Sequence, residues 1–119
     1  MKELFVALAT ISFSLPAAGT QVDCAAIDKA AGISGVLIEG YESGRDVIGK
    51  GRVQFYSAPD HRCKMKGVFV IPGDTVNAYV EYGDFTSVMY ISSTTDSEAV
   101  GWVESSRLKE NGYGIAPRQ

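Results

Sequence analysis

Short apolar runs separated by turn residues dominate the second half of the chain. The longest run, residues 75–82, alternates apolar and polar positions, which is the period of a β-strand with one buried face. Further runs of β-branched and aromatic residues lie at 53–56, 68–71, 86–91 and 100–103, with a closing segment at 105–108. Gly, Pro, Asp and Ser interrupt these runs, as turns do. On this longest strand, we predict that four side chains share one face: Val76, Ala78, Val80 and Tyr82.

This spacing of strands and turns predicts a mainly β fold. Five to six short strands over residues 51–110 are typical of a small antiparallel barrel. Residues 111–119 show no periodicity, and we predict a flexible tail there.

The stretch before residue 51 has a different pattern, because small residues are frequent there and apolar and polar positions do not alternate. Asp23 stands where it can cap a short helix over residues 24–31, and Gly32 would end that helix. Glycines then surround a short apolar run at 36–38, which predicts one strand. We therefore predict an N-terminal extension over residues 20–50 that contains one short helix and one strand.

An apolar segment at residues 4–15 lies between a short charged start and the helix-breaking Pro16. Small residues follow at 17–20, and this order is typical of a secretory signal peptide. The apolar segment is too short to cross a bilayer, which needs about 20 residues. We predict that residues 1–19 are a cleaved signal peptide, so that no membrane anchor remains and the protein is periplasmic or secreted. A buried N-terminal strand or helix is the alternative.

Length and charge exclude several classes of protein. The chain has 119 residues, with 11 Lys and Arg, 14 Asp and Glu, and a net charge of −3. Once the signal peptide is removed, the chain is too short for a Rossmann domain, a TIM barrel or a two-domain enzyme. It has no basic cluster, which argues against nucleic acid and anionic membranes as partners. The mild negative charge favours a cationic partner.

The chain contains two cysteines, Cys24 and Cys63. An even pair in an exported protein predicts one disulfide, which would tether the N-terminal helix to the barrel. Loop entropy assigns about 4 kcal/mol to a closure of this length. A lipoprotein anchor at Cys24 is disfavoured, because the residue before it is Asp23 where lipoprotein processing needs a small residue.

The sequence offers little catalytic chemistry. Its single histidine, His61, lies in a polar turn two residues before Cys63. A nucleophilic cysteine needs an adjacent base and a site that excludes water, whereas an exposed turn provides neither. One histidine and two separated cysteines match no zinc spacing. We therefore predict that the protein is not an enzyme and has no catalytic residues, no metal site and no cofactor.

Aromatic residues are dense between positions 55 and 102, where eight occur. A barrel of this size buries only some of them, so we predict an exposed aromatic patch with acidic loops beside it. In the alternative, Trp102 is packed under the N-terminal extension. The candidate partner-binding residues are Tyr56, Tyr79 and Trp102 in the patch, with Asp60 and Asp84 on the loops.

Residues 51–108 resemble a bacterial SH3-like (SH3b) domain, and the layout is similar to small exported single-domain members of that family. The resemblance implies that 101–103 form a late strand and that 105–108 make a short 3₁₀ turn into the last strand. The N-terminal extension and the long polar segment at 92–98 depart from the family pattern. The segments that carry the resemblance are Phe55-Tyr56, the loop 57–60, Gly73-Asp74, Gly101-Trp102-Val103 and Ser105-Ser106-Arg107-Leu108.

Two functions are compatible with these features. The first is an exported inhibitor or immunity protein that neutralises a cationic hydrolase or toxin attacking the cell envelope. The second is a peptidoglycan or cell-wall binding SH3b module, which we rank lower because no catalytic domain is attached to it. The Ser-Gly-x-x-Tyr signature of lysozyme inhibitors is absent from the chain.

Overall fold

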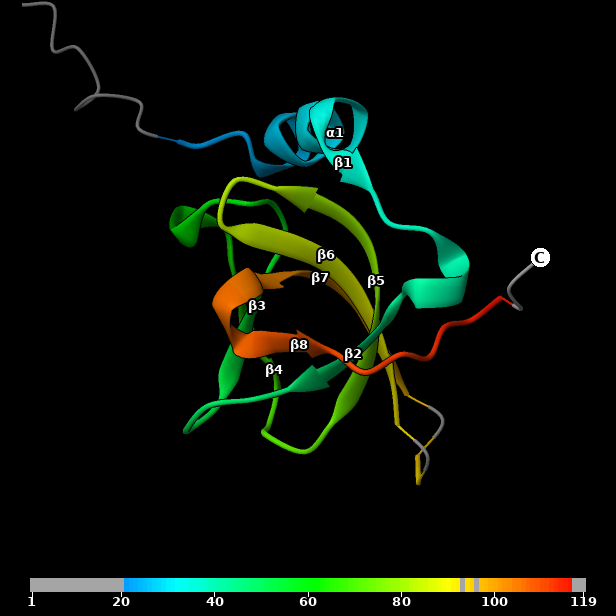
Figure 1. Cartoon of the computed structure of the whole chain (residues 1–119). Helices are drawn as coiled ribbons and strands as arrows, with labels where there is room; N and C mark the ends of the chain where they lie inside the picture. Colours follow the sequence, from blue (N-terminus) through cyan, green and yellow to red (C-terminus); the bar gives the residue numbers. More distant parts are fainter. Residues whose placement is uncertain (1–20, 93, 96, 117–119) are drawn as a thin grey trace, which may run out of the picture.

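The computed structural model describes residues 21–92, 94–95 and 97–116. In these residues eight strands form one antiparallel sheet in the order β4-β3-β7-β6-β5-β2-β8, and β1 also pairs with β5 (Figure 1). The predicted signal peptide, residues 1–19, lies outside them. The elements in chain order are α1 (Cys24–Ser34), β1 (Val36–Leu37), η1 (Gly40–Glu42), β2 (Gly44–Val47), β3 (Val53–Tyr56), η2 (His61–Cys63), β4 (Lys64–Val70), β5 (Thr75–Tyr82), β6 (Phe85–Ile91), β7 (Glu98–Glu104), η3 (Ser105–Arg107) and β8 (Leu108–Glu110).

Strands β5, β6 and β7 form a continuous meander at the centre of the sheet (Figure 1). A tight turn at Gly83 and Asp84 joins β5 to β6, and Gly83 has a φ of 57°, which glycine adopts without steric cost. The pairing of β6 with β7 begins with Phe85 opposite Glu104. β3 and β4 continue the sheet beyond β7, while β2 and β8 continue it beyond β5, so the sheet curls into a half-barrel.

The mainly β fold is confirmed, and residues 51–110 contain six strands, β3 to β8, within the predicted five to six. The extension adds two further strands to the sheet where the sequence predicted one. β2 lies in the range 20–50 that the sequence assigned to the extension, yet it pairs with both β5 and β8. This strand has no apolar signature, because one of its buried residues is Arg45. Its guanidinium donates to the Glu42 and Gly44 carbonyls at 2.6 and 3.0 Å, which allows a charged residue to be buried.

Apolar side chains from most strands fill the inside of the curled sheet. Val76 and Ala78 belong to this core and confirm the predicted face of β5 as far as Ala78, but a β-bulge between Ala78 and Val80 places Val80 in the separate cluster under α1. Tyr82 is 43% exposed, because β5 ends there at the turn into β6. The buried residues of this main core are Val47, Val53, Phe55, Val70, Val76, Ala78, Val88 and Val103.

Helix α1 begins as predicted and ends later. The Asp23 side chain accepts a hydrogen bond from the Ala26 N–H at 3.1 Å, which caps the helix. Gly32 does not end it, since the helix continues to Ser34 and the Gly35 N–H donates to the Ala31 carbonyl at 2.8 Å. A Cβ at Gly35 would meet both Val80 and the Glu81 carbonyl, so the helix ends where the backbone packs closely against β5.

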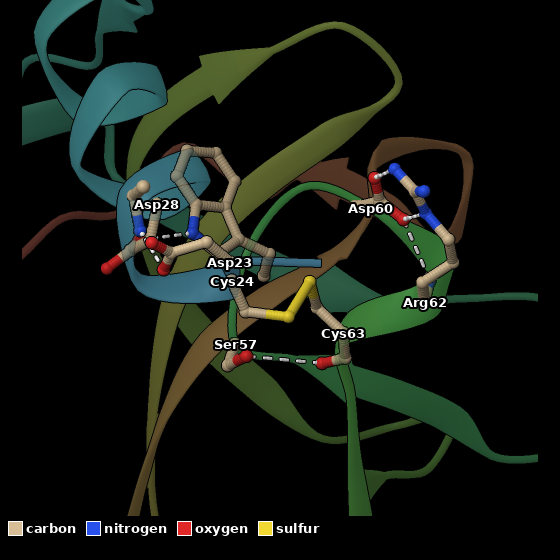
Figure 2. Close-up of a disulfide and its surroundings, with 9 residues drawn as sticks. Asp23, Cys24, Asp28, Ser57, Asp60, Arg62 and Cys63 are labelled. Atoms are coloured by element: carbon tan, nitrogen blue, oxygen red, sulfur yellow. Dashed lines mark hydrogen bonds and ion pairs between the residues drawn. A yellow bond between two sulfur atoms is a disulfide. The ribbon is translucent and has the colours of Figure 1, made fainter. Parts of the chain in front are cut away.

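The predicted disulfide between Cys24 and Cys63 is confirmed (Figure 2). It joins the first turn of α1 to η2, the turn between β3 and β4. An eleven-residue helix is marginal in isolation, so the disulfide and packing hold it in place. The helix covers a second buried cluster, which consists of Ala31, Tyr56, Val80, Phe85 and Trp102.

The end of the chain forms the 3₁₀ turn η3 and then β8, as the SH3-like resemblance implies for residues 105–108. The sequence predicted a flexible tail over 111–119, but residues 111–116 lie along 40–44. The Gly44 N–H donates to the Tyr113 carbonyl at 2.7 Å, and the Ala116 N–H donates to the Gly40 carbonyl at 3.3 Å. These hydrogen bonds join backbone groups, so the pattern of apolar and polar side chains could not predict them. No helix in the described ranges is long and apolar enough to cross a membrane.

Reduction of the disulfide is expected to destabilise the protein, because it opens a covalent loop that spans 39 residues. Loop entropy assigns about 4 kcal/mol of unfolding free energy to this loop, which corresponds to a fall in melting temperature of more than about 10 °C. Thermal melts with and without a dithiol reductant measure the change. A Cys24→Ser, Cys63→Ser double variant should melt like the reduced protein. A melting curve that reduction leaves unchanged would contradict the prediction.

Candidate acidic cleft

A half-open cleft of about 340 Å³, here called the acidic cleft, lies where the β5–β6 turn meets the end of β7. The strand register brings these segments together, since Phe85 at the start of β6 lies opposite Glu104 at the end of β7. The Ser105 N–H also donates to the Asp84 carbonyl at 2.8 Å, which ties η3 to the turn. The cleft is lined by His61, Gly83, Asp84, Glu104, Ser105 and Ser106.

His61 and Glu104 form an ion pair on one wall of this cleft. The His61 Nε2 lies 2.8 Å from the Glu104 Oε1, and the histidine is charged in this pair only when it is protonated. The His61 ring packs edge-on against Tyr56 and Phe85, with centroids 5.4 and 5.0 Å apart. Both side chains of the pair remain partly exposed, at 65% for His61 and 43% for Glu104. The pair therefore holds a carboxylate in a defined orientation that solvent and a ligand can still reach.

A smaller cleft of about 160 Å³, here called the arginine cleft, adjoins the acidic cleft. Glu104 lines both clefts, so they meet at the end of β7. Burial raises the pKa of the Tyr56 hydroxyl, and the negative charge of Glu104 adds to this effect, so Tyr56 is neutral at physiological pH. The arginine cleft is lined by Arg52, Val53, Gln54, Tyr56, Glu104 and Arg107.

The predicted exposed aromatic patch is wrong for two of its three residues. Trp102 is 2% exposed and Tyr56 is 7% exposed. Trp102 lies under the N-terminal extension, as in the alternative interpretation, and its Nε1 donates to the Asp28 carboxylate at 2.7 Å. Tyr79 is half-buried, with its hydroxyl 3.9 Å from the Met89 sulfur, and it lines neither cleft. Tyr56 and Trp102 are buried because helix α1 covers the aromatic cluster to which they belong. The local sequence pattern does not reveal where this helix packs.

The two predicted loop carboxylates differ in their surroundings. Asp84 is exposed and lines the acidic cleft, and no partner for its carboxylate is found among the described residues. Asp60 accepts hydrogen bonds from the Arg62 side chain at 3.0 and 2.8 Å and from the Arg62 N–H at 2.8 Å (Figure 2). These hydrogen bonds lower the Asp60 pKa to about 2. Asp60 is therefore paired within the chain, whereas Asp84 is exposed at the acidic cleft.

Of the residues that line the acidic cleft, the sequence patterns predict only Asp84 as a binding residue. They place His61 in an exposed turn, they use Ser105 and Ser106 only for the SH3-like resemblance, and they do not single out Glu104. His61 and Glu104 are 43 positions apart, so no local motif links them. The only signal was that Glu104 directly follows the buried run ending at Val103, which places it at a strand end.

The groups beside His61 have other partners. Cys63 is bonded to Cys24, so no thiolate is present next to the histidine. The Ser105 hydroxyl lies 2.7 Å from the Thr86 hydroxyl and is hydrogen-bonded to it. Within the described ranges no three His, Cys, Asp or Glu side chains are grouped to hold a metal ion. The arrangement is suited to attracting a cation, because two acidic residues, Asp84 and Glu104, line a partly enclosed space.

Replacement of Asp28 tests the packing of the helix over Trp102. Asp28→Ala removes the acceptor of the indole N–H, and we expect the free energy of unfolding to fall by about 1–2 kcal/mol. Asp28→Asn keeps a carbonyl acceptor at the same place and should lose less. Denaturant unfolding followed by tryptophan fluorescence measures both variants. Equal stability of Asp28→Ala and the unmodified protein would show that this hydrogen bond does not hold α1.

Replacement of Arg62 tests the pairing of Asp60. Arg62→Gln removes the guanidinium, so the Asp60 pKa should rise from about 2 toward its ordinary value of 3.8. Because folding lowers this pKa, the stability it contributes is present above pH 3.8 and is lost as the pH falls through 2. A ¹³C NMR titration of the Asp60 carboxyl measures the shift, with Lys64→Gln as a charge-matched control. An Asp60 pKa that is the same in Arg62→Gln would rule out the pair as its cause.

The chain matches no protein-family model, no curated protein and no solved structure at a significant level. The SH3-like resemblance of residues 51–108 stays a prediction, and the function is inferred from the geometry of the acidic cleft.

Proposed function

We propose that this protein is an exported, non-enzymatic protein-binding domain that receives a basic side chain of its partner in the acidic cleft. The partner is a cationic hydrolase or toxin that attacks the cell envelope, and the protein acts as its inhibitor or immunity factor. The observation that carries this proposal is the cleft itself, which Asp84 and Glu104 line around a space of about 340 Å³.

The size and charge of the acidic cleft suit a lysine or arginine side chain. A cation between the two carboxylates would form charge-assisted hydrogen bonds, which contribute about 1.5–3 kcal/mol each. The His61 contact orients the Glu104 carboxylate before the ligand arrives, so less conformational entropy is lost on binding. The partial enclosure lowers the local screening, so the attraction is stronger there than at an open surface.

An exported location supports the same proposal. The disulfide between Cys24 and Cys63 is typical of a non-reducing compartment outside the cytoplasm. The η3 turn followed by β8 is consistent with an SH3-like barrel, a fold whose members often bind peptides. A small disulfide-bonded domain with an open charged cleft is suited to binding another exported protein.

The acidic cleft is tested first with a small ligand. N-acetyl-lysine methylamide is expected to shift the amide resonances of Gly83, Asp84 and Ser105 in an NMR titration at millimolar concentration. N-acetyl-norleucine methylamide has the same chain length without the charge and should leave them unchanged. Equal shifts from both ligands would show that the cleft does not recognise a cation.

The same cleft is then tested on the intact partner. An envelope hydrolase captured from periplasmic extract should be inhibited by the protein, and an Asp84→Asn, Glu104→Gln double variant should inhibit at least tenfold less well. A Glu39→Gln, Glu98→Gln double variant removes two exposed carboxylates that line neither cleft, so it makes a matched change of charge and should inhibit normally. Co-sedimentation with purified sacculi, without any protein partner, would overturn the proposal in favour of the cell-wall module.

A further inference from the structure

The arginine cleft is not used by the function proposed above, although it opens beside the acidic cleft. Its two guanidinium groups, from Arg52 and Arg107, outnumber its one carboxylate, Glu104. Glu104 in turn contacts His61 on the side of the acidic cleft. The two adjoining clefts therefore differ in charge, with carboxylates in one and guanidinium groups in the other.

The Arg107 guanidinium is held in place by the turn between β2 and β3. Its Nε donates to the Ile48 carbonyl and its Nη2 to the Gly51 carbonyl, both at 2.8 Å. Gly49 lies against this guanidinium with a φ of 91°, and a Cβ there would meet it. A guanidinium has five N–H donors, so two such bonds leave others for a ligand. Arg107 is therefore a fixed cation with hydrogen-bonding capacity to spare.

Arg52 supplies the second cation of the arginine cleft. Its guanidinium carbon lies 4.2 Å from the centre of the Phe69 ring, an arrangement that restrains a long side chain. Gln54 also lines this cleft. Its amide nitrogen donates to the carbonyls of Met65 and Val68, at 2.7 and 3.1 Å, which fixes the side chain in the wall. A guanidinium pairs readily with a carboxylate through two parallel hydrogen bonds, so two restrained arginines lining one small cleft favour a carboxylate as its ligand.

We infer that the two clefts form one groove, which selects a peptide segment where a basic side chain is closely followed by a carboxylate. The basic side chain enters the acidic cleft, and Arg52 and Arg107 bind the carboxylate. This inference rests on the proposed function for the first half of the groove and adds the second half. The carboxylate comes from an acidic side chain or from a free C-terminus, which share the same chemistry.

Three capped lysine tripeptides test the groove by NMR titration of the full mature chain. One has an amide end and no carboxylate, one has a free C-terminal carboxylate, and one has an aspartate as its last residue and an amide end. We expect either carboxylate peptide to bind at least about fivefold more tightly than the amide peptide. The tighter of the two identifies the source of the carboxylate.

Arg52→Gln is the variant of choice, because Arg52 is exposed and Arg107 supports the β2–β3 turn. It should abolish the gain from the carboxylate and leave the affinity for the amide peptide unchanged. Lys50→Gln removes a charge from the same turn without lining either cleft, and it should keep the gain.

The outcomes separate this inference from the proposed function. Equal affinities for all three peptides, with resonance shifts at Asp84, would overturn the inference and leave the proposed function in place. The absence of any shift around Asp84 with all three peptides would overturn both. A gain that survives in Arg52→Gln would also overturn the inference, because the carboxylate would then bind elsewhere.

Discussion

The disulfide between Cys24 and Cys63 holds the two segments that the sheet alone does not position. One is helix α1, which is too short to be stable by itself and which buries Trp102 against the barrel. The other is η2, the turn that carries His61 between β3 and β4. A single covalent bond thus links the aromatic cluster under the helix to the turn that forms one wall of the acidic cleft.

The acidic cleft follows from strand pairing and the arginine cleft from a turn. The register of β6 and β7 sets the β5–β6 turn beside Glu104, which brings two carboxylates to one space. The β2–β3 turn then fixes Arg107 through two of its carbonyl groups, next to the same glutamate. Neither cleft requires a charged group to be buried without a partner, so neither imposes a large desolvation cost on the stability of this small domain. The resulting groove has opposite charges along its length, which favours a ligand with complementary charges.

Sequence patterns predicted those features of the structure that depend on neighbouring residues or on composition. The alternating burial along β5, the Asp23 cap and the cysteine pair all have local or compositional signals, and all three are confirmed. The bulge that divides the predicted face of β5 after Ala78 has no such signal. The patterns failed where long-range packing decides: β2 is a strand built around a buried arginine, and α1 extends past Gly32 until it meets β5. The patterns left Trp102 open between the surface and a position under the N-terminal extension, because the helix that covers it lies far away in sequence. The ion pair in the cleft was missed for the same reason.

The proposed function requires that a cation of the partner lies between Asp84 and Glu104. A crystal structure of the protein with its captured partner is the most direct test of this claim. We predict a lysine or arginine nitrogen of the partner within about 3 Å of both carboxylates, at the distance of charge-assisted hydrogen bonds. An interface on another face of the barrel, with the acidic cleft left open to solvent, would contradict the account.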